Sequence, residues 1–582
     1  MATAVLTGVP TTITLCESVT GWSGDTFSLE PDIKVQGTNS VSCAMTNNGS
    51  NTIAFATSNA PGGTFSAVNI HIRVWVNLAF VGNIDTQANN GIQISIVHGG
   101  GTSLYTVGGS DNYAGGWKQY VVYTGNTPTS GSTPSGTCTS VGLQINTNTK
   151  PRNQPANCWV DAWYFGPGFT VTGGTSGDEI DWSHIAALDA TNAYGVCTRL
   201  DDIYFLAGDI NIGSGATATW FKSAQKVQFR DLPVSSTLYG VTFSGSGARI
   251  NITGGAWGAA GTQNYFVDAS DSTMTSFSLT GVQFSKSSGI TFANGQTVTN
   301  SVFDSCGQVV PSTSSFHNHT FSNYVGTTGA LLYPSDDTNI YSLNFVNCDN
   351  GVQYTAASDS TSPAFDAFIF DDAAGNFDVN NTSGSAVSIS KNNGSNPNSY
   401  NTANSVVTFL GASVTTAINV KDIATGNNLQ DARVLVYVTD GTNFPFEDTV
   451  SISGSGTTAT VTHTAHGLST GDHVIINGST ADEYNGTYQI TVTGTNTYTY
   501  NTGETVTTGT PGGTIICTFA FISGLTNASG NISDSRVVNA DQPIAGRIRK
   551  SSSSPYFIQG SITGTVSSTT GFSAVVQLVR DE

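Results

Sequence analysis

Four aspartates are the residues of this 582-residue chain whose type and spacing could support a reaction. Each follows a short apolar segment that contains a Phe, and they are Asp304, Asp349, Asp371 and Asp372. Two carboxyl groups about 5–9.5 Å apart can hydrolyse a glycosidic bond. Asp also favours turns, because its side chain hydrogen-bonds the nearby backbone. We favour the turn interpretation, so no catalytic residue is assigned and the balance is against an enzyme.

Two histidines form a second candidate site. One residue separates His317 from His319, so a regular strand would place both imidazoles on one face, where they could bind a metal. The eight Cys show no C-x-x-C spacing, and the chain contains no P-loop, dinucleotide fingerprint or nucleophile elbow in a supporting context. We therefore expect no metal and no cofactor, with this His pair as the weak exception.

A repeated pattern must position these candidates. Between residues 241 and 410 an apolar strand, a Phe and a Gly, Ser, Asn or Asp turn recur at spacings of 18 to 25 residues. The repeat is anchored at Phe243, Phe266, Phe284, Phe303, Phe321, Phe345, Phe370, Ile389 and Phe409. A repeat of strands at this spacing is typical of a β-solenoid, in which each coil buries its apolar face against its neighbours.

An antiparallel sandwich is the alternative explanation, because Phe also recurs in sandwiches at shorter intervals. Sandwich strands need not keep one spacing over many anchors, so the solenoid is favoured. It predicts that Phe284, Phe303, Phe321 and Phe345 stack inside.

Composition sets the class and excludes several functions. Sixty-six Gly and few charged residues, at 10%, predict an all-β chain. A net charge of −20 argues against nucleic acid or an anionic membrane as a partner. Residues 1–10 lack the pattern of a secretion signal, and no apolar run is long enough for membrane insertion. The sparse Cys are expected to be reduced and buried.

The predicted domains follow from shifts in this pattern. Alternating strands up to residue 170 predict a jelly-roll sandwich similar to carbohydrate-binding modules. Residues 171–235 form a linker and capping segment, in which Asp181 or Ser183 caps a short helix, and residues 236–412 form a right-handed parallel β-helix. Residues 413–446 and 515–582 resemble a transthyretin-like sandwich, interrupted by a small β-module at 447–514.

Tryptophans in residues 1–170 are candidates for contact with sugar. Trp22 and Trp117 are the two that we select, because an exposed indole ring can stack on a pyranose. A Trp in a sandwich is more often part of the core, so both assignments depend on exposure.

Two segments resemble proteins of tailed bacteriophages. Residues 218–234 resemble a segment that opens β-helical regions of virion proteins, and residues 459–476 with 484–490 resemble a small β-module of phage structural proteins. The resemblance implies a structural virion protein, assembled in the host cytoplasm, that contacts other virion proteins and forms a homotrimer.

The place on the virion has several interpretations. A tail fibre, tailspike or other surface appendage that attaches to host cell-surface glycan is the first. A capsid-decorating protein or head fibre, a polysaccharide depolymerase and a bacterial surface adhesin are the alternatives. A β-helix serves adhesion, scaffolding and catalysis alike, so the fold class does not choose among them.

Overall fold

The computed structural model describes residues 2–46, 49–79, 81–113, 115–148, 156–230, 238–259, 265–361, 363–371, 376–411, 413–506 and 509–581. Strands dominate, and α1 (Trp182–Asn192) is the only α-helix in these ranges, so the predicted all-β class is confirmed. None of the helices in them is both long and apolar enough to cross a membrane. The chain divides into two compact units, residues 1–361, 368–386 and 398–406 in the first and the remainder in the second.

The first unit begins with two antiparallel sheets, called here the two-sheet region (residues 11–165). One sheet has the order β12-β10-β9-β13-β6-β3, with β7 beside β13, and the other has the order β11-β8-β14-β5-β4, with β2 beside β14. Their strands are β2 (Thr11–Thr14), β3 (Trp22–Gly24), β4 (Phe27–Glu30), β5 (Ser40–Met45), β6 (Ser50–Ala56), β7 (Phe65–Ser66), β8 (His71–Leu78), β9 (Ile92–His98), β10 (Gly101–Gly108), β11 (Trp117–Tyr123), β12 (Ser130–Gly131), β13 (Thr137–Asn146) and β14 (Ala156–Phe165). Alternate residues of both sheets contribute to one apolar core. Three short 3-10 turns connect strands here, η1 (Thr57–Asn59), η2 (Val81–Asn83) and η3 (Gln87–Asn89).

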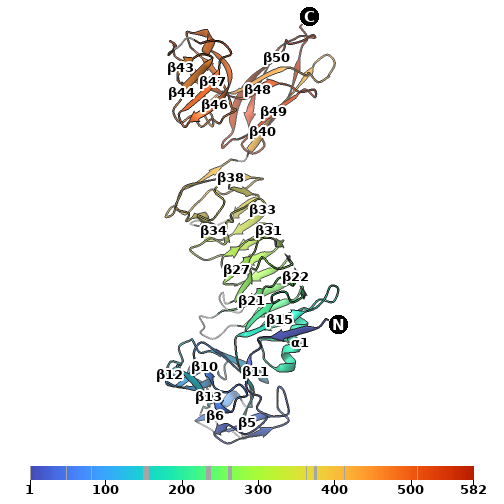
Figure 1. Ribbon diagram of the computed structural model, residues 1–582, viewed down its shortest axis with the longest axis vertical. Helices are drawn as coiled ribbons and strands as arrows, with labels where there is room; N and C mark the ends of the chain where they lie inside the picture. Colours follow the sequence, from blue (N-terminus) through green and yellow to red (C-terminus); the bar gives the residue numbers. More distant parts are fainter. Residues whose placement is uncertain are drawn as a thin grey trace. The chain divides into compact units, whose positions relative to one another are not determined.

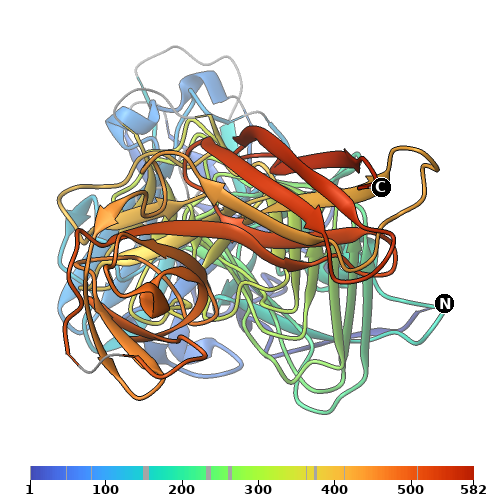
Figure 2. The ribbon, with the colours of Figure 1, turned by 90° about the horizontal axis from the view of Figure 1, so that it is seen from above.

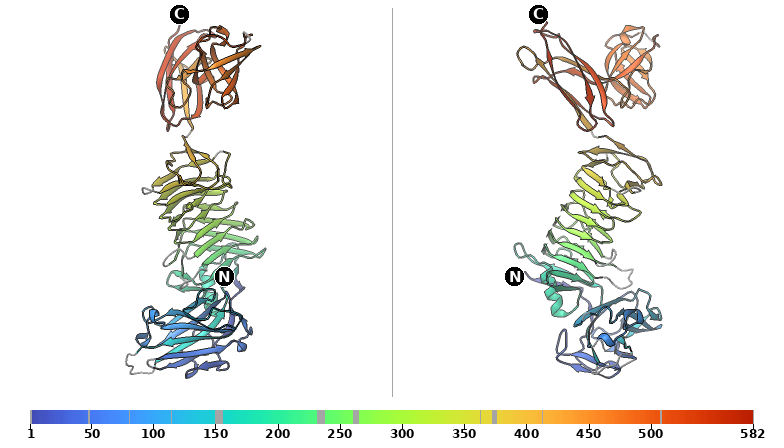
Figure 3. Two further views of the ribbon diagram at one scale, coloured as in Figure 1. Left: turned by 90° about the vertical axis from the view of Figure 1, so that its left-hand side faces the viewer. Right: turned by 180° about the vertical axis from the view of Figure 1, so that it is seen from behind.

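Most of the rest of the first unit is a stack of short parallel strands, called here the parallel stack (residues 168–361 and 368–381), which Figures 1 and 3 show as successive layers. Most strands pair in parallel with the strand three places further along the chain, so three strands complete one circuit.

Three ladders result. The first contains β15 (Gly168–Gly173), β18 (Asp209–Ile212), β21 (Tyr239–Phe243), β24 (Tyr265–Ala269), β27 (Gly289–Phe292), β30 (Val309–Val310), β32 (Leu331–Leu332), β34 (Asn350–Tyr354) and β37 (Phe377–Asn381). The second contains β19 (Thr219–Ser223), β22 (Ala248–Thr253), β25 (Ser276–Thr280), β28 (Thr297–Thr299), β31 (Ser315–Ser322) and β33 (Ile340–Val346). The third contains β17 (Ile203–Leu206), β20 (Lys226–Phe229), β23 (Ala256–Ala259), β26 (Gln283–Ser285), β29 (Val302–Asp304), β31, β33 and β36 (Phe368–Asp371). At the start of the stack, β1 (Ala4–Thr7) pairs antiparallel with β15, and β16 (Cys197–Leu200) pairs antiparallel with β17.

A column of Phe rings fills the stack, as the repeat predicts. The pairing register aligns Phe284, Phe303, Phe321, Phe345 and Phe370. Successive ring centroids are 5.5, 5.0, 5.0 and 4.8 Å apart, with nearly parallel planes. The prediction that the first four of these rings stack inside is confirmed, since each is at most 2% exposed.

The anchors Phe243 and Phe266, at the start of the repeat, belong to the first ladder and not to the ring column. Trp257, rather than Phe266, pairs with Phe284 and begins the column. Phe266 is opposite Gly240 and half-buried, while Phe243 is buried in the first ladder. A coil has three strands, so the spacing of Phe residues does not determine which strand of the coil carries each ring. Ile389 pairs with Phe409 in the second unit.

Residues with a left-handed backbone conformation occur at a fixed distance in sequence after four Phe residues of the ring column. Lys286, Ser305, Asn323 and Asn347 each lie two residues after a column Phe and have φ between 52 and 60°. Asn tolerates this conformation because its short side chain hydrogen-bonds locally. The amide of Asn347 donates to Asn323 at 3.1 Å, so the turns of adjacent coils are bonded to each other.

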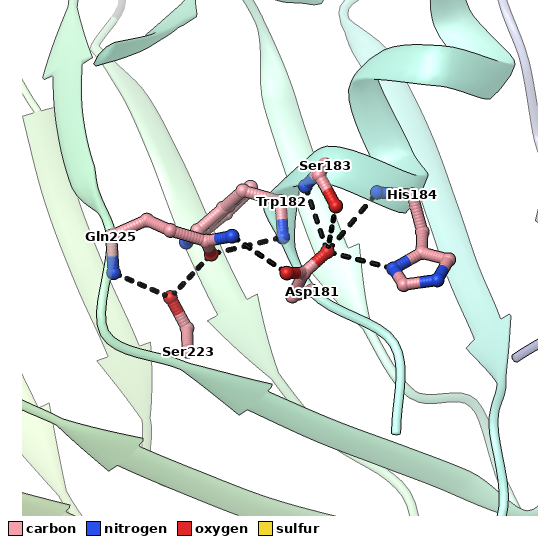
Figure 4. A network of polar contacts seen from close by, with 6 residues as sticks. All are labelled: Asp181, Trp182, Ser183, His184, Ser223 and Gln225. Atoms are coloured by element: carbon pink, nitrogen blue, oxygen red, sulfur yellow. Dashed lines mark hydrogen bonds and ion pairs between the residues drawn. The ribbon is translucent and has the colours of Figure 1, made fainter. Parts of the chain in front are cut away.

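The helix α1 lies at the start of the stack. Asp181 is its N-cap, one of the two residues predicted, and accepts from the backbone N–H of Ser183 and His184 (Figure 4). The side chain of Gln225 donates to Asp181 at 2.6 Å and ties the cap to the stack. Trp182 is fully buried, with its ring edge-on to Phe221 and Trp257. The helix therefore covers the apolar interior of the first coils.

A buried arginine joins the two-sheet region to the stack. Arg73 has no exposed surface, and its guanidinium donates to the carbonyls of Gly166 and Pro167 at 3.1 and 2.7 Å. It also lies 5.8 Å from the ring centroid of Tyr239. All eight Cys fall within the described ranges, and each is buried and outside any disulfide, as expected.

The second unit contains three sheets, two of which share a separate apolar core. The first has the order β35 (Ala364–Asp366), β38 (Val387–Asn392), β39 (Val407–Leu410), and the second has the order β49 (Asn531–Val537), β40 (Ser413–Asp422), β52 (Phe572–Leu578). The ten-stranded sheet contains β43 (Ser451–Ser455), β44 (Thr458–Thr462), β47 (Thr497–Asn501), β46 (Gly486–Gly494), β45 (His473–Asn477), β48 (Ile516–Leu525), β41 (Arg433–Val438), β50 (Gln542–Lys550) and β51 (Phe557–Val566), with β42 (Asp448–Thr449) beside β48. The 3-10 turn η4 (Asp482–Tyr484) precedes β46. The C-terminal strands of the second unit are red in Figure 2. Strands β41 and β48 pair directly although residues 439–515 separate them in the chain.

Candidate functional site

Asp304 and Asp371, two of the candidate carboxylates, do not form a pair suited to hydrolysis. In the third ladder the register runs from Asp304 through Ser322 and Val346 to Asp371. Three strand spacings separate the two aspartates, about 14 Å at about 4.8 Å each. That separation exceeds the range of two-carboxylate glycosidases. Asp372 lies outside the described residues.

Two of these carboxylates hold turns. Asp304 accepts from the hydroxyl of Ser322 at 2.8 Å and from the amide of Asn323 at 2.7 Å. Asp349 accepts from the backbone N–H of Gly326 at 3.2 Å. Asp371 is exposed on β36. Asp304 also lines a shallow groove of about 520 Å³ along β20, β23, β26 and β29. These contacts agree with the turn interpretation.

The two candidate histidines lie on opposite sides of the stack wall, so the prediction of a shared face is wrong. Asn318 between them has a φ of 59°, which breaks the alternation of the strand. His319 points inward and is 1% exposed, whereas the ring of His317 is half-buried outside, stacked 4.5 Å from that of Tyr341. In the described part of the chain, no group of three or more His, Cys, Asp or Glu could hold a metal.

His319 serves the core instead. Its Nδ1 accepts from the backbone N–H of Ser301, and its Nε2 donates to the carbonyl of Val298, each at 3.1 Å. Burial lowers the pKa of this imidazole to about 3, so the ring is neutral at pH 7.

The two selected tryptophans differ in exposure. Trp22 is 7% exposed and belongs to the core of the two-sheet region, with its ring 5.3 Å from that of Phe55. It therefore offers no ring face to a sugar, and its assignment as a glycan contact is wrong. The reason is that β3 is only three residues long, too short for alternation to reveal the inward face. Trp117 is half-buried at the start of β11.

Strand pairing places a second tryptophan in the same row as Trp117. Trp117 is opposite Asn77, and Asn77 is opposite Trp159 on β14. The adjacent residues Val76, Cys158 and Val160 belong to the core, so this row faces outward. The two indoles are two strand spacings apart, about 10 Å. Both are half-buried, and the amide of Asn77 lies between them.

This tryptophan row (Trp117, Asn77 and Trp159) has the chemistry of a sugar-binding surface. Indole faces pack against the apolar face of a pyranose, and an amide between them can hydrogen-bond the hydroxyls. The sequence alone did not single out Trp159. The alternation of 157–160, with Cys158 and Val160 inward, is the signal that could have placed it outside.

No protein-family model matches the chain, and no curated protein matches it.

Proposed function

We propose that the protein is a structural component of a tailed-bacteriophage virion, a tail fibre, tailspike or other surface appendage that adheres to host glycan. The observation that carries this proposal is the tryptophan row on a region joined through Arg73 to a long parallel stack. A rigid stack built from local contacts suits an appendage that must withstand force and proteolysis.

The finer architecture is part of the proposal. Pairing of each strand with the strand three places on is what a three-sided parallel β-helix requires. Parallel crossovers are almost always right-handed, which supports the right-handed form. The two-sheet region is proposed as a jelly roll, and the second unit as a transthyretin-like sandwich in which β43 to β47 belong to an inserted module.

Two alternatives remain for the same chain. A capsid-decorating protein or head fibre would use the same rigid body at another place on the virion. A polysaccharide depolymerase has less support, because Asp304 and Asp371 are about 14 Å apart.

The glycan proposal predicts a selective effect of the tryptophan row. Trp117→Ala and Trp159→Ala should each weaken binding to purified host capsule or lipopolysaccharide about tenfold, or about 1.4 kcal/mol, because each removes a stacking surface. Biolayer interferometry on the full chain measures this. Tyr556→Ala, which removes a 51% exposed ring of the second unit, is the matched control and should bind normally.

Two results would contradict the proposal. Unchanged binding in both tryptophan variants would show that the row is not a glycan contact. Release of new reducing ends from the polysaccharide, abolished by Asp304→Asn or Asp371→Asn, would replace adhesion with the depolymerase function.

Assembly is a further expected outcome. Four apolar side chains, Val325, Tyr341, Val346 and Ile369, are 37–75% exposed on the later coils of the stack, as a subunit contact would require. Light scattering of the purified chain should give three times its mass of 60.3 kDa. Ile369→Lys should shift that mass toward the monomer. A stable monomer of the unsubstituted chain at micromolar concentration would contradict the trimer.

A further inference from the structure

A cavity of about 390 Å³ lies in the first unit, where the edge strand β11 meets the first coils of the stack. Its wall combines two cationic side chains, Lys118 and Arg230, with the aromatic residues Tyr120 and Tyr239 and the amides of Gln87 and Asn112. Gln119 and the aliphatic residues Val107, Val121 and Ala207 complete the lining. This volume falls within the range of small-molecule sites, about 300–1,000 Å³.

Among the described residues, the partners of the two cations are neutral. Nζ of Lys118 donates to the carbonyl of Asn112 at 2.9 Å and lies 5.0 Å from the ring centroid of Tyr120. Nη2 of Arg230 donates to the hydroxyl of Thr198 at 3.3 Å, and its guanidinium lies 5.3 Å from the ring centroid of Phe205. Within the described ranges, neither cation forms an ion pair with a carboxylate.

The placement of two partly buried cations in one cavity is electrostatically unfavourable when no anion is bound. Burial and the nearby Arg230 lower the pKa of Lys118, and burial lowers the pKa of Arg230. The chain has 39 acidic residues and only 19 basic ones, so a lack of carboxylates in the sequence does not explain why these two cations lack an acidic partner among the described residues. Asp111 is not among the lining residues, and its carboxylate accepts from the backbone N–H of Gln87 at 2.8 Å. A bound anion would remove the repulsion between the two cations.

We propose that this cavity binds a carboxylate-bearing sugar residue, such as a uronate, of a host polysaccharide. The carboxylate would be held between Lys118 and Arg230, which donate charge-assisted hydrogen bonds. Gln87 and Asn112 would hydrogen-bond the hydroxyls of the sugar. The proposal rests on the glycan adhesion proposed above and specifies an acidic glycan.

Calorimetric titration of the full chain tests this proposal with tetragalacturonate, the neutral maltotetraose and inorganic phosphate as separate probes. We expect tetragalacturonate to bind, maltotetraose to bind at least about tenfold more weakly, and the affinity to fall with rising ionic strength. Lys118→Met and Arg230→Met should each weaken tetragalacturonate binding about tenfold or more. Their melting temperatures should not fall, because each variant removes an unpaired cation. Lys226→Met is the matched control, since Nζ of Lys226 pairs with Asp202 at an exposed site 2.9 Å away.

Three outcomes would overturn the cavity proposal: unchanged affinity in both cation variants, equal binding of maltotetraose, or phosphate binding as tight as that of tetragalacturonate. The test separates this proposal from adhesion. If the cation variants bind tetragalacturonate normally while the tryptophan variants lose host polysaccharide, the cavity proposal alone fails. If Lys118 and Arg230 are needed for tetragalacturonate but the intact chain binds no host polysaccharide, adhesion alone fails.

Discussion

Replacing Phe303 with Ala will lower the free energy of unfolding of the parallel stack by about 3–5 kcal/mol. The ring is 2% exposed and stacks on Phe284 and Phe321, with centroids 5.5 and 5.0 Å away. Both neighbours are held by their own coils, so the cavity cannot collapse fully. Denaturant unfolding of the full chain, followed by hydrogen exchange in β26, β29 and β31, measures the loss and its location.

Phe266→Ala is the matched control for this experiment. Its ring is half-buried outside the column, where it covers Gly240. It should cost clearly less than Phe303→Ala, because part of its surface is already in water. Equal losses from the two variants would show that the column is not the main source of stability in these coils.

Acidification will destabilise the stack through His319. Burial lowers the pKa of His319 in the folded state to about 3, whereas the unfolded chain titrates near 6.5. Below about pH 6.5 the unfolded state therefore binds more protons. The free energy of unfolding is highest above that pH and falls by about 1.4 kcal/mol per pH unit down to about pH 3.

The variant His319→Gln isolates this contribution. An amide can accept from Ser301 N–H and donate to the carbonyl of Val298, as the imidazole does, but it does not titrate. Unfolding free energies measured across this pH range should show a slope reduced by about 1.4 kcal/mol per unit. His317→Gln, on the outer side of the same strand, should change the slope less. An unaltered slope in His319→Gln would mean that the ring is not kept neutral in the folded protein.

Sequence reasoning succeeded where one residue type recurs at one place in the coil. Phe284, Phe303, Phe321 and Phe345 were predicted to stack because like residues lie over like in a solenoid. It failed at Phe266 because the ring column begins with Trp257, on a different strand of the same coil. The spacing between Phe residues indicates the length of a coil. It does not indicate which of the three strands in the coil carries the Phe, and therefore not which ladder the ring joins.

The predictions about His317, His319 and Trp22 failed because of the local backbone structure. A single left-handed residue, Asn318, reverses the relation between His317 and His319. Trp22 belongs to a strand too short to show alternation. The tryptophan row and the cationic cavity depend on long-range pairing, which brings Trp159 beside Asn77 and Arg230 near Lys118. No pattern within one segment encodes such neighbours.

The three-strand circuit makes the length of the stack adjustable in fixed steps. Because each coil contacts only the coils next to it, duplication or deletion of one circuit leaves all other contacts intact. Each such event would change the reach of the molecule by about 4.8 Å. In-frame recombination between coils would therefore lengthen or shorten the stack by whole coils while leaving the remaining coils unchanged.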